Sequence, residues 1–205
     1  MIAALAVAAI VTIQPIEAHA MTTERVTFED EATATEEKED VCYIAQEEER
    51  KAKERIAAYE AAVGDYNAKL AEYYNESDIV MLAQLIDIEA GSVWPLCRRA
   101  AVGWTVCNRI DNGRWGPTSI SGIITQPGQY AYYSGRGYSD LNYRIAEDVL
   151  RRWADEKVTG EENPGRTLPA GFDCFYGDGD QNHFYGPDGT WDYSFPGFDP
   201  YENWQ

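Results

Sequence analysis

The segment 79-IVMLAQLIDIEAGSVW-94 places two acidic residues, Asp87 and Glu89, at the end of an apolar run. A helix turns by about 100° per residue, so Glu89 falls on the same face as Leu82 and Ile86, and Asp87 is expected to point away from that face, to solvent. A carboxyl group in an apolar setting keeps its proton more readily than one in water. Such an acid can protonate a glycosidic oxygen, which makes Glu89 the candidate general acid.

A structural interpretation of Glu89 is also open. A glutamate near the end of a helix can reach a backbone amide or an arginine and simply hold the chain in place. Gly91 follows shortly after and is expected to end the helix.

Neither a metal ion nor another cofactor is expected. The segment 178-DGDQN-182 has the D-x-D-x-N spacing of a calcium-binding loop, but His183 stands where that loop requires glycine, and no glutamate closes it. The chain also has two histidines and no C-x-x-C pair, so the sequence does not indicate a zinc cluster.

Hydrophobic periodicity and capping residues predict a mainly helical α+β domain over residues 76–205. Asn75 or Ser77 can cap its first helix. The predicted helices are 78–90, 96–110, a short helix within 118–133 that Ser119 or Ser121 would cap, and 139–156. Two short strands, 172–176 and 183–186, are predicted to pair across a polar turn. The tail 191–205 is expected to lie extended over the domain.

Three segments precede this domain. Residues 1–20 are expected to be a secretory signal peptide, because an apolar run ends in the A-x-A pattern 18-AHA-20. An uncleaved anchor and a buried helix are the alternatives. Residues 21–40 are acidic and rich in threonine, which is typical of a disordered linker. Residues 41–75 are rich in helix-forming residues and are predicted to form a helical stalk.

Apolar residues recur along the stalk at alternating steps of three and four: Ile56, Tyr59, Val63, Tyr66, Leu70 and Tyr73. This spacing is typical of a coiled-coil seam. The stalk therefore either self-associates through residues 56–73 or packs against the domain that follows it.

Composition limits the partners. The formal net charge is −18, from 35 acidic and 17 basic residues. Nucleic acid is excluded because its phosphates are bound by clustered Lys and Arg, which this chain lacks. Contact with a membrane is expected only if the N-terminal segment stays uncleaved.

The four cysteines are compatible with an exported protein. Cys97 and Cys107 fall in one predicted helix, about 15 Å apart, which is too far for a disulfide. Any disulfide would therefore join one of them to Cys42 or Cys174.

Four segments, taken together, resemble the SleB/CwlJ-type cell wall hydrolase family. They are 82-LAQLIDIEAGS-92, 101-AVGWTVCNRI-110, 120-ISGIITQPGQY-130 and 181-QNHFY-185, and they occur in the order of the family pattern. One departure is that Ser92 and Val93 stand where many members carry an acidic residue.

This resemblance implies a lysozyme-like fold and an extracytoplasmic enzyme. Its substrate would be peptidoglycan, cleaved between N-acetylmuramic acid and N-acetylglucosamine, in spore cortex or vegetative wall. The family's catalytic glutamate falls on Glu89. It would protonate the leaving oxygen and then take a proton from the muramoyl C6 hydroxyl, which gives a 1,6-anhydro product; hydrolysis by water is the alternative.

The resemblance also suggests residues that contact the sugar. Gln126, Gln129 and Tyr130 match the family's Q-P-x-Q-aromatic segment, where amides and an aromatic ring suit N-acetyl sugars. Further candidates for substrate binding are Tyr132, Tyr176 and His183. Asn108 and Arg109 are instead expected to tie the end of their helix to neighbouring segments.

Two other functions stay open. A cysteine peptidase or amidase acting on peptide stems would use Cys97 or Cys107 as nucleophile and His183 as base. However, Cys107 lies in the middle of a predicted helix, where no helix N-terminus lowers its pKa. The other alternative is a non-catalytic wall-binding domain held on a helical stalk.

Overall fold

The computed structural model describes residues 28–186, 193–195, 197 and 199–204, with side chains described from Tyr43 onward. The predicted signal peptide lies outside these residues. The chain divides into two compact units, with the boundary between Ala57 and Ala58.

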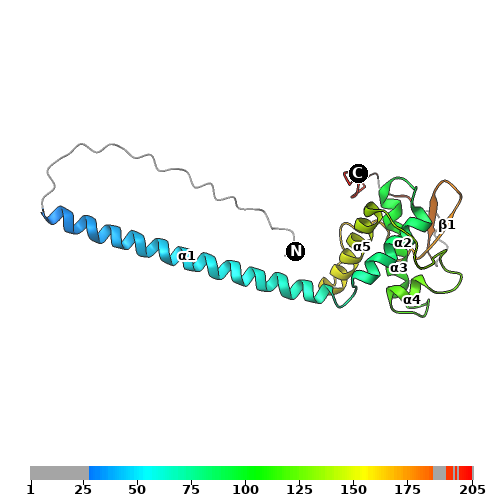
Figure 1. Cartoon of the computed structure of the whole chain (residues 1–205), viewed down its shortest axis with the longest axis horizontal. Helices are drawn as coiled ribbons and strands as arrows, with labels where there is room; N and C mark the ends of the chain where they lie inside the picture. The colour runs from blue at the N-terminus through cyan, green and yellow to red at the C-terminus, as the bar shows by residue number, and fades with distance from the viewer. Residues whose placement is uncertain (1–27, 187–192, 196, 198, 205) are drawn as a thin grey trace. The chain divides into compact units, whose positions relative to one another are not determined.

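The first helix, α1, runs from Phe28 to Leu70 (Figure 1). The disorder expected for 21–40 therefore does not hold for residues 28–40. The physical reason is that Ala, Glu and Lys favour a helix. Further along α1, acidic residues also lie one turn before basic ones. Two such pairs join Glu47 to Lys51 at 3.4 Å and Glu49 to Lys53 at 2.7 Å.

The apolar seam of α1 is used differently along its length. Tyr59 and Val63 are exposed, whereas Leu70 is buried. The Tyr66 hydroxyl donates to Asp155, and the Tyr73 ring meets the Trp153 ring edge-on, with centroids 6.1 Å apart. The end of the seam thus packs on the following domain, and self-association through residues 56–73 stays a prediction.

Four helices form the body of the second unit. They are α2 (Glu76–Ala90), α3 (Leu96–Asn112), α4 (Ile120–Ile124) and α5 (Asp140–Thr159). Side chains of Asn75, Ser119 and Ser139 cap α2, α4 and α5; Asn75 and Ser119 are among the expected caps, whereas no cap was predicted for α5. At the end of α2, a Cβ on Gly91 would lie 2.4 Å from the Asp87 backbone oxygen, so that position requires glycine.

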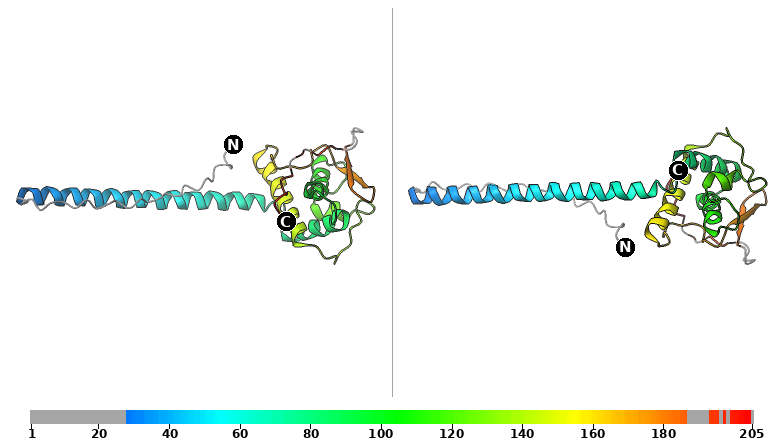
Figure 2. Two further views of the ribbon diagram at one scale, coloured as in Figure 1. Left: turned by 90° about the horizontal axis from the view of Figure 1, so that it is seen from above. Right: turned by 90° about the horizontal axis from the view of Figure 1, so that it is seen from below.

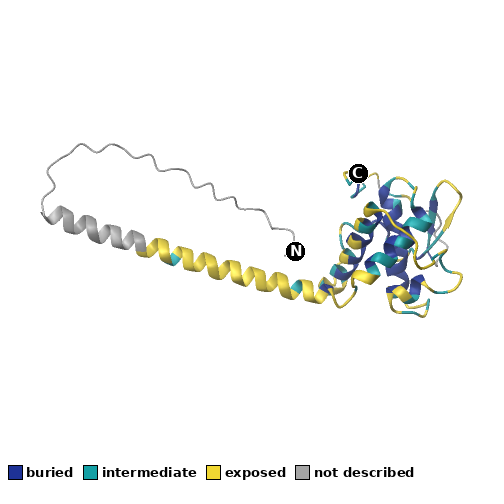
Figure 3. Cartoon of the chain, in the orientation of Figure 1, coloured by how far each residue is buried: buried dark blue, intermediate teal, exposed yellow. Residues whose placement is uncertain are grey.

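The core lies between α2, α3 and α5, and α3 is buried along most of its length (Figure 3). Leu82, Leu85 and Ile86 of α2 are fully buried, as the periodicity predicted, and Trp104 and Ile145 face them from within the same core. Both views of Figure 2 show α5, in yellow, on one side of the domain and the strands, in orange, on the other.

The strands form one antiparallel hairpin. They are β1 (Cys174–Gly177) and β2 (Asn182–Tyr185), and Tyr176 pairs with His183. Phe184 points into the core, and its backbone oxygen accepts a hydrogen bond from Tyr193 N at 3.0 Å. The described part of the tail therefore packs on the domain. The domain is mainly helical with one small sheet, which confirms the predicted class; the likeness to lysozyme stays a prediction.

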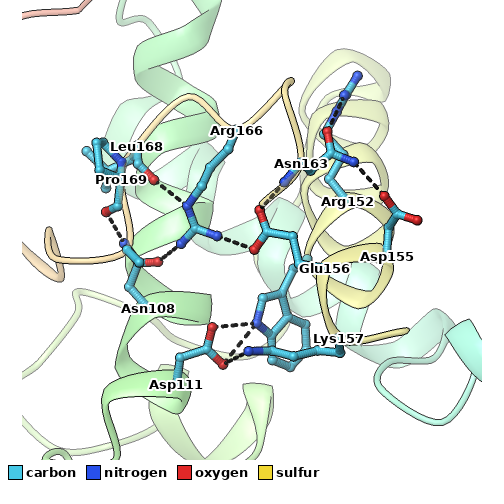
Figure 4. A network of polar contacts seen from close by, with 12 residues as sticks. Asn108, Asp111, Arg152, Asp155, Glu156, Lys157, Asn163, Arg166, Leu168 and Pro169 are labelled. Carbon is cyan, nitrogen blue, oxygen red and sulfur yellow. Dashed lines mark hydrogen bonds and ion pairs between the residues drawn. The ribbon is translucent and has the colours of Figure 1, made fainter. Parts of the chain in front are cut away.

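A buried arginine fixes the loop between α5 and the hairpin (Figure 4). Arg166 forms an ion pair with Glu156 of α5 and donates to Asn108 of α3. Its Nε donates to Leu168 O at 2.8 Å, and its guanidinium lies 4.2 Å from the Trp104 ring centroid. Arg166 therefore joins α3, α5 and the loop at one point.

A buried carboxylate, Asp173, joins α3 to the start of β1. It accepts hydrogen bonds from Trp115 Nε1 at 2.9 Å and Asn112 Nδ2 at 3.0 Å, and it forms an ion pair with Arg114. Burial alone would raise the pKa of Asp173, but these three donors outweigh it and hold the pKa below the ordinary value of 3.8. The ionised form is therefore the one that stabilises the fold.

Replacement of this acid tests its contribution. Asp173→Asn should lower the free energy of unfolding by about 2 kcal/mol at neutral pH, because an amide nitrogen would then face a donor. Because the pKa of Asp173 is lowered in the folded state, its stabilisation is present above about pH 4 and is lost as the pH falls through the lower, folded-state pKa. The free energies of unfolding of wild type and Asp173→Asn should therefore become equal in acid, as measured by urea unfolding at several pH values.

The matched control is Asp65→Asn, at an exposed position of α1. It should leave the unfolding midpoint unchanged. An equal loss in both variants, or a gap between wild type and Asp173→Asn that widens in acid, would contradict this account.

Candidate functional site

A cleft of about 450 Å³ opens at the C-terminal end of α2. Residues 87–93, from the end of α2 and the turn after it, line one part of the cleft. The hairpin turn contributes Gly177, Gly179 and Asp180 together with Gln181 and Asn182, and the loop before α5 contributes Arg136. Its walls thus come from segments that lie far apart in the sequence.

Glu89 lines this cleft and is half-buried. Its Oε1 accepts a hydrogen bond from Ala131 N at 2.7 Å, and its backbone oxygen accepts one from Asn182 Nδ2 at 3.1 Å. The carboxylate therefore sits at the end of the apolar face of α2 rather than inside it, which corrects the expected apolar setting. The backbone amide contact is the one that the structural interpretation anticipated, and it leaves the carboxylate at the cleft.

Asp87 does not point to solvent, which corrects the sequence prediction. Its Oδ1 accepts hydrogen bonds from Asn142 Nδ2 at 2.8 Å and from Ser139 N at 3.3 Å. Asn142 is buried and also accepts from Arg99 Nη1 at 3.2 Å. The physical reason is that the N-terminus of α5 packs beside α2 and supplies donors that periodicity along α2 alone cannot reveal.

Gln126, Gln129 and Tyr130 of the Q-P-x-Q-aromatic segment do not line the cleft. Gln126 Nε2 donates to Trp115 O at 3.0 Å, and Gln129 Oε1 accepts from Arg109 Nη1 at 3.4 Å. The Tyr130 and Thr105 hydroxyl oxygens are 3.0 Å apart. The segment therefore packs against α3, and its link to Glu89 is the amide of the next residue, Ala131.

The other predicted contact residues also lie outside the cleft lining. The Tyr132 hydroxyl donates to Gln84 Oε1 at 3.0 Å. On the hairpin, the rings of Tyr176 and His183 stack with centroids 4.9 Å apart, and Tyr176 is about half exposed. His183 Nε2 lies 2.7 Å from Asp178 Oδ2 and holds the pKa of that carboxyl below its ordinary value. This pair orders the turn that forms one wall of the cleft.

Sequence reasoning missed four residues that line the cleft: Arg136, Asp180, Gln181 and Asn182. The signal for three of them was present in 178-DGDQN-182, which was assigned to the turn of the hairpin and weighed for calcium but not for the cleft. The side-chain Oδ1 of Asp178 accepts from the backbone N–H of Asp180 and of Gln181, both at 2.9 Å, so this carboxylate shapes the turn.

Arg109 supports the segment that contacts Glu89. Its guanidinium lies between the rings of Trp115 and Tyr130, 4.2 and 4.5 Å from their centroids. Its Nε donates to Asp173 O at 2.8 Å. Asn108 donates to Pro169 O at 2.9 Å. Both residues thus tie the end of α3 to neighbouring segments, as their position suggested.

The described part of the chain offers no group of three or more His, Cys, Asp or Glu side chains arranged to hold a metal ion. Among those same residues, no helix combines the length and apolar character needed to cross a membrane.

The described cysteines are free thiols. Cys97, Cys107 and Cys174 form no disulfide bond, and the side chain of Cys42 lies outside the described residues. Burial raises the pKa of Cys97 to about 11 and raises that of Cys107 further above its ordinary range. None of the three lines the cleft.

Comparison with known families gives one match. A family model described as Cell Wall Hydrolase matches residues 98–167, about a third of the 205-residue chain. This stretch contains most of α3 and all of α4 and α5, whereas Glu89 precedes it and the hairpin follows it. Neither the curated proteins nor the solved structures contained a match. The match supports the resemblance that the sequence showed.

The bond from Asn182 to the end of α2 is testable without an assay. Asn182→Ala removes the donor to Glu89 O and should destabilise hairpin docking by about 1 kcal/mol. Hydrogen exchange of the β1 and β2 amides should become faster than in wild type. Asp180→Asn, at an exposed position in the same turn, should leave exchange unchanged. Unchanged protection in Asn182→Ala would show that this bond does not hold the hairpin.

Proposed function

We propose that the chain, which matches a Cell Wall Hydrolase family model over residues 98–167, acts on peptidoglycan and cleaves the glycan strand with Glu89 as general acid and base. The bond is the one between N-acetylmuramic acid and N-acetylglucosamine. The observation that carries the proposal is that Glu89, whose carboxylate is held by Ala131 N, lines the 450 Å³ cleft.

The hydrogen bonding of Glu89 suits a proton donor. Ala131 N binds Oε1 and orients the carboxyl group, while Oε2 makes no hydrogen bond with any described residue. A proton on Oε2 can therefore be passed to a sugar oxygen in the cleft. The hydrogen bond from Asn182 to the backbone of Glu89 limits movement of the residue during the transfer.

The reaction follows from one such group. Glu89 protonates the glycosidic oxygen, the C1–O bond breaks, and the leaving sugar departs with the proton while positive charge develops on the muramoyl ring. The carboxylate then accepts the proton of the muramoyl C6 hydroxyl as its oxygen bonds to C1, which gives a 1,6-anhydro end. Mass spectrometry distinguishes this from hydrolysis, whose product is heavier by one water.

Hydrolysis would need a group that activates water on the far side of the sugar. Asp180 of the hairpin turn lines the same cleft, and its carboxylate makes no ion pair with a described residue. If the released ends carry the extra water and Asp180→Asn abolishes their formation, the enzyme is a hydrolase with two carboxylates.

Substitution of Glu89 is the direct test. Glu89→Gln keeps an acceptor for Ala131 N but cannot donate or accept the proton, so release of sugar ends from purified sacculi should fall about 10³-fold. Thermal unfolding should stay unchanged. The matched control, Glu147→Gln on the exposed face of α5, should digest sacculi like wild type.

Two outcomes would overturn the proposal. If Glu89→Gln releases sugar ends at the wild-type rate, another group performs the proton transfer. If neither the wild type nor the variant releases any product while both sediment with sacculi, the domain binds the wall without cleaving it.

The thiol alternative conflicts with the burial of the cysteines. Cys97 and Cys107 are almost fully buried and their raised pKa values keep them as thiols near neutral pH. His183 is engaged by Asp178 on the hairpin. Treatment of the folded protein with iodoacetamide near neutral pH should therefore leave the cleavage rate unchanged. Complete inactivation by iodoacetamide, together with loss of cleavage in a Cys107→Ala variant, would favour the peptidase.

A further inference from the structure

The cleft has an uneven charge distribution. Its lining contains three carboxylates, Asp87, Glu89 and Asp180, and one guanidinium, Arg136. Arg136 comes from the loop before α5, and Asp180 comes from the hairpin on another wall. The chain as a whole carries a net charge of −18, so a cation in this position is unusual for its surroundings.

Arg136 is anchored through its backbone and only loosely through its side chain. Its backbone oxygen accepts from Gln84 Nε2 at 2.7 Å, which fixes the loop to α2. Its Nη1 donates to the Tyr133 hydroxyl at 3.0 Å, and its Nη2 lies 3.9 Å from Asp87 Oδ2. The side chain is about 45% exposed. Most of its five N–H donors are therefore available to a ligand.

Asp87 does not neutralise this arginine fully. Its Oδ1 is engaged by Asn142 and Ser139, and the distance from its Oδ2 to Arg136 exceeds that of a hydrogen bond. A planar guanidinium with free donors at the edge of a cleft is suited to bind a carboxylate through two parallel hydrogen bonds.

We propose that Arg136 binds a carboxylate of the muramoyl unit, namely a free carboxylate of its stem peptide, and thereby selects glycan strands that still carry their peptides. This inference rests on the proposed cleavage of the glycan strand. N-acetylglucosamine is neutral, so the peptide stem supplies the negative charge near the bond that Glu89 cleaves.

The charge of the protein explains why this contact matters. An anionic peptide that approaches Asp87, Glu89 and Asp180 is repelled, and Arg136 offsets that repulsion at one place only. The contact then fixes which sugar of the alternating strand carries its substituent toward the loop wall. Binding of the peptide on that wall places the muramoyl residue beside Glu89.

The test compares three forms of one purified glycan strand preparation. The first carries native stem peptides, and the second has the peptide carboxylates converted to methylamides. The third has its peptides removed by an amidase, which leaves the lactyl carboxylate of each muramoyl unit. Rates of release of sugar ends are measured for wild type, Arg136→Gln and the control Arg144→Gln. Arg144 is exposed on α5, where its guanidinium lies over the Trp204 ring.

We expect Arg136→Gln and methylamidation of the strands to weaken substrate binding by the same amount. Arg136→Gln should raise KM for native strands about tenfold with little change in kcat, because one charged hydrogen-bonded contact is lost. Methylamidation should raise the wild-type KM by the same factor, and the two changes together should not add. Arg144→Gln should follow wild type on every substrate.

Two outcomes would overturn the inference. An equal loss for Arg136→Gln on native and methylamidated strands means that the arginine acts on the loop and not on a carboxylate. A wild-type KM for peptide-free strands as low as for native ones, with the same dependence on Arg136, assigns the contact to the lactyl carboxylate instead of the peptide.

Glu89→Gln separates this inference from the proposed function. If Glu89→Gln cleaves native strands normally, the glycosidase proposal fails regardless of Arg136. If Glu89→Gln is inactive and Arg136→Gln behaves like wild type on native strands, only the role of Arg136 is lost.

Discussion

The site depends on two hydrogen bonds that meet at Glu89. Ala131 N binds its side chain and Asn182 Nδ2 binds its backbone, from positions 42 and 93 residues away in the sequence. The first orients the carboxyl group, and the second ties the hairpin to the last turn of α2. Because α2 ends at Gly91, the orphan carbonyl groups of its last turn are free to accept such partners. The cleft exists because two distant segments converge on this helix end.

The support for these two bonds comes from α3. Arg109 lies between Trp115 and Tyr130 and thereby fixes the segment that contains Ala131. It also donates to the backbone of Asp173, directly before β1. One buried arginine thus holds both the loop that orients Glu89 and the strand that leads to Asn182. Arg109, Trp115 and the segment that contains Ala131 fall within the Cell Wall Hydrolase match, whereas Asp173 and the proposed acid lie outside it.

Charged groups inside the domain and charged groups in the cleft differ in how completely they are paired. Inside the domain, buried charged groups have several partners each: Asp173 accepts from Asn112, Arg114 and Trp115, and Arg166 contacts two helices and a loop. Such groups are fixed, because a buried charge that loses its partners is costly. In the cleft, Glu89 keeps one oxygen unbonded and Arg136 is held loosely. The groups available for chemistry and binding are those that the fold leaves incompletely satisfied.

The sequence by itself determined the helices, their caps and the hairpin, because periodicity and capping are local properties. It also placed Glu89 on the face that continues Leu82 and Ile86. Only the tertiary structure decided what surrounds each polar residue. Asp87 was misplaced because its partners belong to the N-terminus of α5. Gln129 and Tyr130 contact α3, which local patterns could not reveal, and the contact of Gln126, Gln129 and Tyr130 with sugar stays a prediction. The residues of the cleft walls come from loops without periodicity, and their positions follow from hydrogen bonds between segments far apart in the chain.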